Sequence, residues 1–130
     1  MNKRTMFLVL GILAVVPAIA HHSFTAEFDS SRPVVVSGTV TKVDWINPHA
    51  RVYMDAKDAA GAVAHWEFEL GSPNILMHKG WSRNSLKPGD EITVDGFLAK
   101  DAANVANASE IKLANGKKGF AGSEYNGTSK

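Results

Sequence analysis

The sequence predicts a small, mainly β protein, and three observations lead to this prediction. Two neighbouring segments, residues 50–57 and 63–70, alternate apolar and polar side chains, which is typical of strands with one buried face. A valine-rich run precedes them, and a short helix start separates them from two later strand patterns. Three strands, a helix and two strands make the element order of a five-stranded OB-like barrel, with a short helix between strands three and four. A small sandwich is the competing architecture.

The first 20 residues have the pattern of a secretory signal peptide. Lys3 and Arg4 precede an apolar run over residues 6–16, and Ala18 and Ala20 form the small-residue pattern that signal peptidase accepts. The alternative is an uncleaved membrane anchor, which the shortness of the apolar run disfavours. We therefore expect a periplasmic or secreted protein with no membrane span after signal cleavage.

Charge and cysteine content exclude several classes of protein. The chain has 14 Lys and Arg against 13 Asp and Glu, and cleavage after residue 20 would leave 12 basic residues. Without a basic excess, no nucleic-acid partner is expected. The chain has no cysteine, so disulfides, thiolate metal sites and a lipid-anchored cysteine are excluded.

The N-terminal part of the predicted mature chain consists of an arm and a long strand. Residues 21–33 are predicted to form the arm, with Phe24 and Phe28 as anchors on the domain. The strand covers residues 34–45 and has apolar residues in phase up to Val40, after which Val43 takes the opposite parity. This change of phase predicts a bend or a bulge.

The two alternating segments are predicted to form a β-hairpin around a turn at residues 58–61. A slip of one residue would place apolar side chains of one strand opposite polar side chains of the other. The pairing that keeps both apolar sets on one face is Ala50–Leu70, Val52–Phe68 and Met54–Trp66. It gives the polar face three pairs, which are Arg51–Glu69, Tyr53–Glu67 and Asp55–His65.

The C-terminal half contains the helix and the last two predicted strands. Ser72 is predicted to be the N-cap before Pro73 and Gly80 to end the helix, so a helix of one or two turns is expected between them. Residues 91–98 and 107–113 are predicted strands, which places the barrel domain at residues 34–113. Residues 114–130 are predicted to be a flexible tail.

Four segments resemble an uncharacterised family of small exported Gram-negative bacterial proteins, known only as a domain of unknown function. They are HHSF (21–24), WINPHAR (45–51), WEFELGSPN (66–74) and GWSRNSLKPGD (80–90). The resemblance covers nearly all of the predicted mature chain. It implies export and a small OB-like domain, and it supplies neither an activity nor site residues.

Histidines suggest a metal site, with copper as the possible cofactor. Cleavage after residue 20 would expose the α-amine of His21, followed by His22, and an amine with an imidazole is a good chelate for Cu(II). His49 or His65 could complete the site. The alternative is that the two N-terminal histidines are only a polar start of the mature chain.

Ligand-binding candidates lie on the polar hairpin face and among the loop aromatics. Arg51, Tyr53, Glu67 and Glu69 share the face on which OB folds commonly bind ligands, although a solvated, salt-bridged face is the simpler interpretation. Two tryptophans could form a stacking platform or cap the open end of the barrel, and an arginine could bind an anion; these are Trp45, Trp81 and Arg83.

These features support three hypotheses on function. The first is an exported binding or accessory module without catalytic activity, because no catalytic constellation is recognisable. The second is a copper-binding protein that uses His21. The third is a structural envelope protein that docks to a partner through the hairpin face or the loop around Trp81. The expected partner is therefore an unknown small ligand or an envelope protein.

Overall fold

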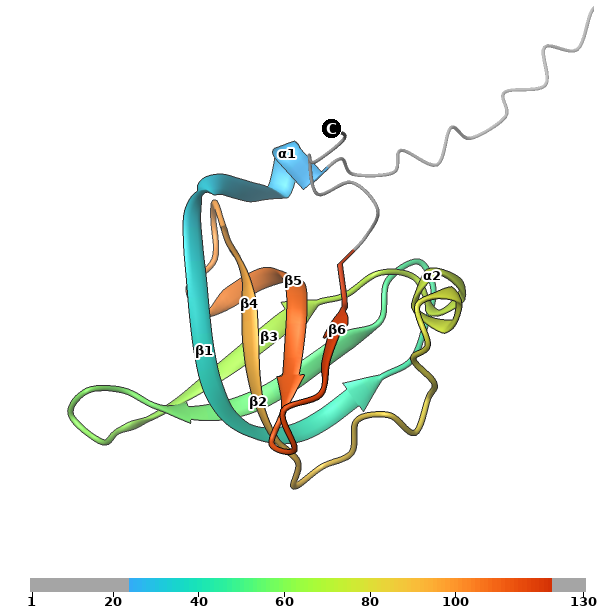
Figure 1. The fold of residues 1–130 in the computed structure, drawn as a ribbon. Helices are drawn as coiled ribbons and strands as arrows, with labels where there is room; N and C mark the ends of the chain where they lie inside the picture. The colour runs from blue at the N-terminus through green and yellow to red at the C-terminus, as the bar shows by residue number, and fades with distance from the viewer. Residues whose placement is uncertain (1–23, 123–130) are drawn as a thin grey trace, which may run out of the picture.

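The structure, a computed structural model, describes residues 24–122. These residues form one mixed sheet and two short helices (Figure 1). In chain order the elements are α1 (Phe24–Glu27), β1 (Phe28–Asp44), β2 (Arg51–Lys57), β3 (Val63–Glu69), α2 (Pro73–His78), β4 (Glu91–Ala99), β5 (Val105–Leu113) and β6 (Lys118–Phe120). Among the described residues, no helix is long and apolar enough to cross a membrane.

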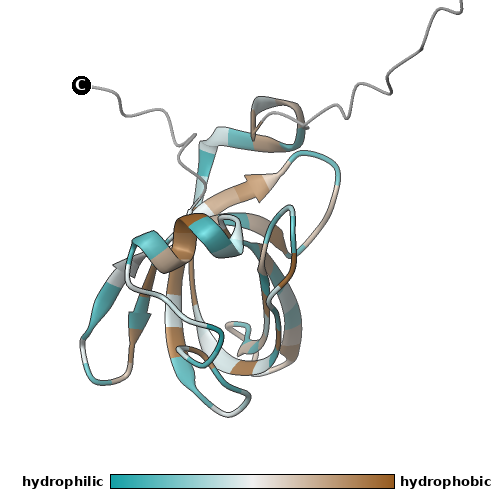
Figure 2. Cartoon of the chain, turned by 90° about the vertical axis from the view of Figure 1, so that its right-hand side faces the viewer, coloured by the Kyte–Doolittle hydropathy of each residue, from teal (hydrophilic) through white to brown (hydrophobic). Residues whose placement is uncertain are grey.

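The sheet closes into a ring of five strands. Its order is β3-β2-β1-β4-β5-β6, and an additional parallel pairing joins β3 to β5. All other neighbours are antiparallel. Figure 2, viewed from the side of α2, shows the resulting ring-like arrangement. Strand β6 pairs with β5 and lies outside the ring closure.

Strand β1 pairs with two neighbouring strands because it bends. Its first part pairs with β4 and its second part with β2, and the register shifts between Val40 and Lys42. The predicted change of phase after Val40 is therefore confirmed as a β-bulge or irregularity. At the crossing of β1 and β2, a Cβ atom on Gly38 would lie 2.2 Å from the carbonyl oxygen of Asp55, so the close approach of the two strands requires glycine there.

The hairpin β2–β3 has the predicted register. Val52 pairs with Phe68, Met54 with Trp66, and the three predicted polar pairs lie on the other face. Ala50 and Leu70 also lie opposite each other, because the Leu70 N–H donates to the Ala50 carbonyl at 2.8 Å.

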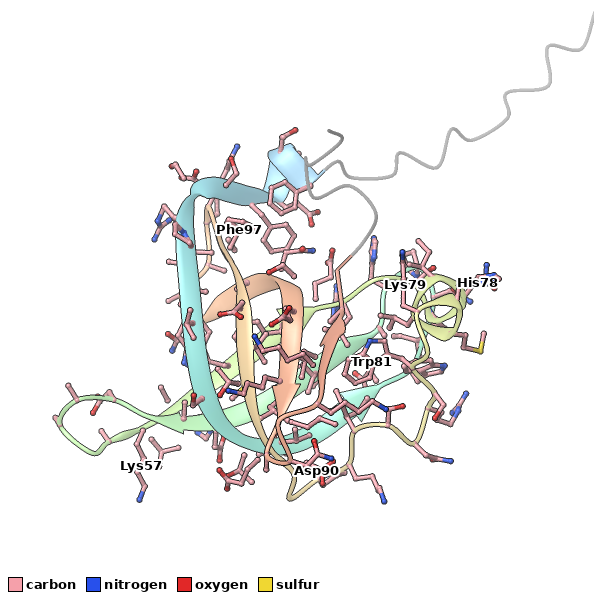
Figure 3. All side chains as sticks on the ribbon, viewed as in Figure 1. Lys57, His78, Lys79, Trp81, Asp90 and Phe97 are labelled. Carbon is pink, nitrogen blue, oxygen red and sulfur yellow. The ribbon has the colours of Figure 1, made fainter. Side chains whose placement is uncertain are left out.

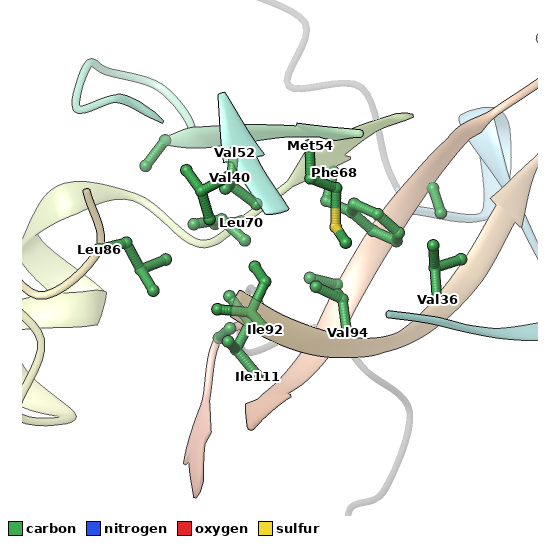
Figure 4. Close-up of a cluster of buried hydrophobic side chains, with 14 of the residues drawn as sticks. Val36, Val40, Val52, Met54, Phe68, Leu70, Leu86, Ile92, Val94 and Ile111 are labelled. Atoms are coloured by element: carbon green, nitrogen blue, oxygen red, sulfur yellow. The ribbon is translucent and has the colours of Figure 1, made fainter. Parts of the chain in front are cut away.

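The interior of the ring is filled by side chains from all of its strands (Figure 4). Phe68, Met54 and Val52 are fully buried there, and the ring of Trp66 stacks on Phe68 with 5.5 Å between centroids. Trp66 itself is only partly buried. Other fully buried side chains include Val40, Leu76, Val94 and Ile111.

The predicted helix after β3 is present as α2, and its predicted cap is confirmed. The Ile75 N–H donates to the hydroxyl of Ser72 at 3.2 Å, and Pro73 is the first helical residue. The prediction was nevertheless incomplete, because the structure has a second helix, α1, in the segment predicted to be an arm.

Strand boundaries differ from the prediction at both ends of the domain. β1 starts at Phe28, inside the predicted arm, and Phe24 packs on Phe28 and Phe97 with centroids 5.6 and 5.9 Å apart. The two predicted aromatic anchors are thus confirmed. β6 lies in the predicted tail, so the expectation of five strands is corrected to six.

The side chains of β5 that face the core change parity along the strand. The register shifts opposite Asp95 and Gly96, so Ala106, Ala108 and Ile111 face the core. At this shift the hydroxyl of Ser109 donates to the Asp95 carbonyl at 3.0 Å.

Candidate functional site

The strongest candidate site lies on the polar face of the hairpin, at the end nearest α1. The period-two alternation of β2 and β3 puts Arg51, Glu67 and Glu69 on this face, and the register brings them together. Arg51 Nε lies 3.2 Å from Glu67 Oε1, and its Nη2 lies 3.8 Å from Glu69 Oε2. One guanidinium therefore bridges two carboxylates that follow one another on the same face of β3.

Glu69 is the most enclosed ionisable group of this cluster. Its side chain is 13% exposed, and burial raises the pKa of the carboxyl, with repulsion from Glu27 acting in the same direction. His49, Arg51 and a hydrogen bond from the side chain of Asn107 lower the pKa and offset part of this effect. The net result is a carboxylate whose charged form is disfavoured by its surroundings.

His49 is oriented towards the same carboxylate. Its Nδ1 lies 3.2 Å from the carbonyl oxygen of Leu70, which can only accept a hydrogen bond, so Nδ1 carries a proton. Its Nε2 lies 3.9 Å from Glu69 Oε1. The loop that connects β1 to β2 therefore contributes one imidazole to the cluster.

An open hollow of about 270 Å³ lies beside these side chains. It is bounded by α1, by the polar face of β2 and β3, and by the loop between β4 and β5. Its ionisable lining residues are Glu27, Arg51, Glu67, Glu69 and Asp101. Four carboxylates against one guanidinium make this hollow a region of negative potential.

Asn107 lies beneath the cluster on β5, opposite Glu69 in the parallel pairing. It is 1% exposed and is the buried polar residue of the described core. Its amide hydrogen-bonds to Glu69, whereas its Oδ1 has no partner among residues 24–122. Asn107 thus holds Glu69 in place from the sheet.

The other end of the hairpin face forms a separate group. His65 Nδ1 lies 2.6 Å from Asp55 Oδ1, and the ammonium of Lys42 lies 5.0 Å from the centre of the Tyr53 ring. His65 is four positions before Glu69 on β3, which is about 13 Å along a strand. The structure therefore does not bring His49 and His65 together.

The structure bears on the metal site only within residues 24–122. In that range, no group of three or more His, Asp or Glu side chains is placed to hold a metal ion. His21 and His22 lie outside the described residues. The copper site predicted from them therefore stays a prediction.

The loop aromatics pack against the core. Trp45 and Trp81 line one small space at the α2 end of the ring, together with Leu70, Leu76 and other apolar residues. This space measures about 10 Å³, which is room for roughly one water molecule and not for a ring. Arg83 is exposed in the loop between α2 and β4. The predicted stacking platform would require both indoles to move.

The alternation of β2 and β3 predicted that Arg51, Glu67 and Glu69 share one face, but no pattern in the sequence indicated three further residues around them. Glu27, Asp101 and Asn107 come from α1, the β4–β5 loop and β5, all distant in sequence from the hairpin. The phenylalanines that anchor α1 were the one signal that this segment folds back onto the domain.

We expect Glu69→Gln to change the pH dependence of stability. Because burial raises the pKa of Glu69 in the folded state, the unfolded chain releases this proton at lower pH, near 4.5. The contribution of Glu69 to stability is therefore greatest at low pH, and it falls as the pH rises from about 4.5 through the higher pKa of the folded state. The free energy of unfolding of the wild type minus that of Glu69→Gln should be larger at pH 4 than at pH 7, as measured by urea denaturation.

The matched control for this measurement is Glu91→Gln, which removes a carboxylate from an exposed position of β4. It corrects for the general effect of losing one negative charge. A difference between wild type and Glu69→Gln that stays constant or grows from pH 4 to pH 7 would contradict the prediction.

Comparison with known proteins identifies the family of the chain. Residues 10–107 match the model of a family described as a family of unknown function (DUF6152). No curated protein matches the sequence. The family match covers well over half of the 130 residues. The chain therefore belongs to this family of unknown function.

Proposed function

We propose that the protein is an exported binding or accessory module of a Gram-negative bacterium, located in the periplasm or secreted, without catalytic activity of its own. The signal-peptide pattern of residues 1–20 supports export. On the hairpin face, Arg51 forms ion pairs with Glu67 and Glu69. Because these groups are engaged with one another and not arranged to activate a nucleophile, they support a binding role rather than a catalytic one.

The architecture we propose for the domain is an OB-like barrel. The five-stranded ring, the bulged first strand and the position of α2 between β3 and β4 support this assignment. Ligands of OB folds bind on the face of strands two and three and at the loops that join strands one to two and four to five. The observation that carries the proposal is that the hollow beside Glu69 is lined by β2, β3 and the β4–β5 loop.

The charge of the hollow favours a ligand that carries a positive group. A small organic cation would fit, and so would a lysine or arginine side chain presented by an envelope protein. Glu67 and Glu69 would bind this group, and Arg51 would hold the two carboxylates apart in a fixed geometry. The same face would serve either as a ligand site or as a docking site.

Titration with putrescine, a small diamine, tests this site by two-dimensional NMR. Saturable shifts are expected for residues of β2, β3 and the β4–β5 loop. Glu67→Gln should weaken binding about threefold, because one exposed charge pair is lost. The control Glu91→Gln, on the exposed side of β4, should not change the affinity. Shifts outside the hollow, or equal affinities for all three proteins, would reject the site.

A copper-binding protein is the second candidate function, and the orientation of His49 favours it. A metal-binding histidine commonly donates its other ring nitrogen to a carbonyl or carboxylate, as His49 Nδ1 does to Leu70. Phe24, packed on Phe28 and Phe97 next to the hollow, is three residues from His21, or about 11 Å of extended chain. A site made of His21 and His49 would need no other histidine.

Copper titration of the correctly processed protein separates this candidate from the first. His21→Ala and His49→Ala should each weaken Cu(II) binding by at least tenfold, whereas His65→Ala and His78→Ala should leave it unchanged. Equal weak binding by the wild type and His21→Ala would remove the copper function and would leave the putrescine result unaffected.

A further inference from the structure

A second concave site lies where the residues that follow α2 approach the end of β5 and the start of β6. It measures about 150 Å³. Its principal lining residues are Lys79, Trp81, Ser85, Lys117, Lys118 and Gly119. Figure 3 shows Lys79 and Trp81 together on the α2 side of the molecule. The site does not share a lining residue with the hollow beside Glu69.

Three lysines from separate parts of the chain line this site. Lys79 caps the end of α2, Lys117 belongs to the turn before β6, and Lys118 is the first residue of β6. Among the described residues that line the site, none carries a carboxylate. The ammonium of Lys118 lies 3.4 Å from Glu110 Oε1, an ion pair between partly exposed groups. Three lysines and no carboxylate among the described lining residues give the site a net positive charge and a positive potential.

The indole of Trp81 is a fixed wall of this site. A Cβ atom on Gly119 would lie 2.6 Å from Cζ2 of the indole, so only glycine lets the β6 backbone approach so closely. Trp81 also packs against the hydrophobic core and lines the small space at the α2 end of the ring. The indole is therefore held by β6 and by the core, and its orientation in the site is defined.

From this combination we propose that the site binds a compact anionic ligand, in which a phosphate, sulfate or carboxylate group is carried on a ring. The lysines would bind the anionic group, and the wall formed by Trp81 would contact the ring, since aromatic side chains offer a large apolar face. The volume is below the usual range of drug-sized pockets, which start at about 300 Å³, so a single ring or sugar is the expected size.

This site is independent of the proposed function at the hairpin. The site is lined by lysines and would take an anionic ligand, whereas the hollow beside Glu69 is lined mainly by carboxylates and would take a cationic one. It also differs from the anion site expected at Arg83, because Arg83 does not line this second site. Lys79, Lys117 and Lys118 take the anion-binding role that the sequence suggested for Arg83.

Titration with phenyl phosphate, followed by NMR of the tryptophan indoles, tests the proposal. The chain has three tryptophans, and Trp81→Phe identifies the signal of Trp81. We expect a saturable shift of that signal. Phenol, which has no charge, and inorganic phosphate, which has no ring, should each bind at least threefold more weakly. Affinity for phenyl phosphate should fall as salt is raised, since exposed charges are screened.

Lysine variants provide the decisive comparison. Lys79→Gln and Lys117→Gln should each weaken phenyl phosphate binding by about two- to fivefold, the range for one exposed charge pair. Lys57→Gln is the matched control, because it removes the same charge at the far end of the hairpin (Figure 3). Unchanged affinity in both site variants, or no shift of the Trp81 signal, would overturn the proposal. All these positions are on the surface, so circular dichroism suffices to verify folding.

Discussion

Phe68→Ala is expected to lower the free energy of unfolding by about 3–5 kcal/mol, the range for removal of a buried phenylalanine. Phe68 is 0% exposed at the centre of the ring, where it lies opposite Val52 and stacks on Trp66. The strands around Phe68 are joined by a closed set of pairings. The surrounding side chains therefore have little freedom to fill the cavity that the truncation would leave. Urea denaturation followed by tryptophan fluorescence measures the loss.

Phe97→Ala is the matched control for this experiment. Phe97 lies on β4 and packs outside the ring against Phe24 of α1, so it is only partly buried. Its truncation removes the same atoms but leaves the interior intact, and the loss should be clearly smaller. Near-wild-type stability of Phe68→Ala, or a larger loss for Phe97→Ala, would show that Phe68 is not the centre of the core.

The hairpin could be predicted residue by residue because its information is local. In β2 and β3 every second side chain is apolar, and a slip of one residue would no longer keep Val52, Met54, Trp66 and Phe68 on one face. The helix α2 was equally readable from Ser72 and Pro73, because capping depends on neighbours in sequence.

The start of β1 and the strand β6 could not be predicted from local patterns. Residues 28–33 contain two serines and a proline and show no alternation, and they belong to a strand because Phe28 and Pro33 at their two ends pair with β4. β6 has three residues and is held by distant partners, namely the pairing with β5 and the contact of Gly119 with Trp81. Such long-range contacts leave no period in the sequence.

The candidate site was predictable to the same extent. Alternation placed Arg51, Glu67 and Glu69 on one face of the hairpin. It did not show that α1 and the β4–β5 loop would bound a hollow there, because that depends on closure of the ring. The lysine site escaped prediction for the same reason, since Lys79 and Lys117 are 38 positions apart in sequence.

Gly38→Ala is expected to destabilise the domain by about 3 kcal/mol, the upper end of the usual cost of overpacking. The added Cβ would lie 2.2 Å from the Asp55 carbonyl oxygen and 2.9 Å from Cε of Met54. The methionine tip can move, but the carbonyl belongs to the backbone of β2, which is itself paired with β3. Relief therefore requires β1 and β2 to separate where β1 turns from one neighbour to the other.

Two comparisons show whether this close approach is the cause. Val35→Ala, at a position of β1 that is 66% exposed, should change stability by less than about 0.5 kcal/mol. Gly61→Ala, where a Cβ meets nothing within 4 Å but φ is +83°, should cost about 1 kcal/mol through backbone conformation alone. If Gly38→Ala costs no more than Gly61→Ala, the strands tolerate a wider spacing at the bend. A larger cost, with NMR shifts centred on Asp55 and Met54, would show that ring closure depends on one glycine at the β1–β2 crossing.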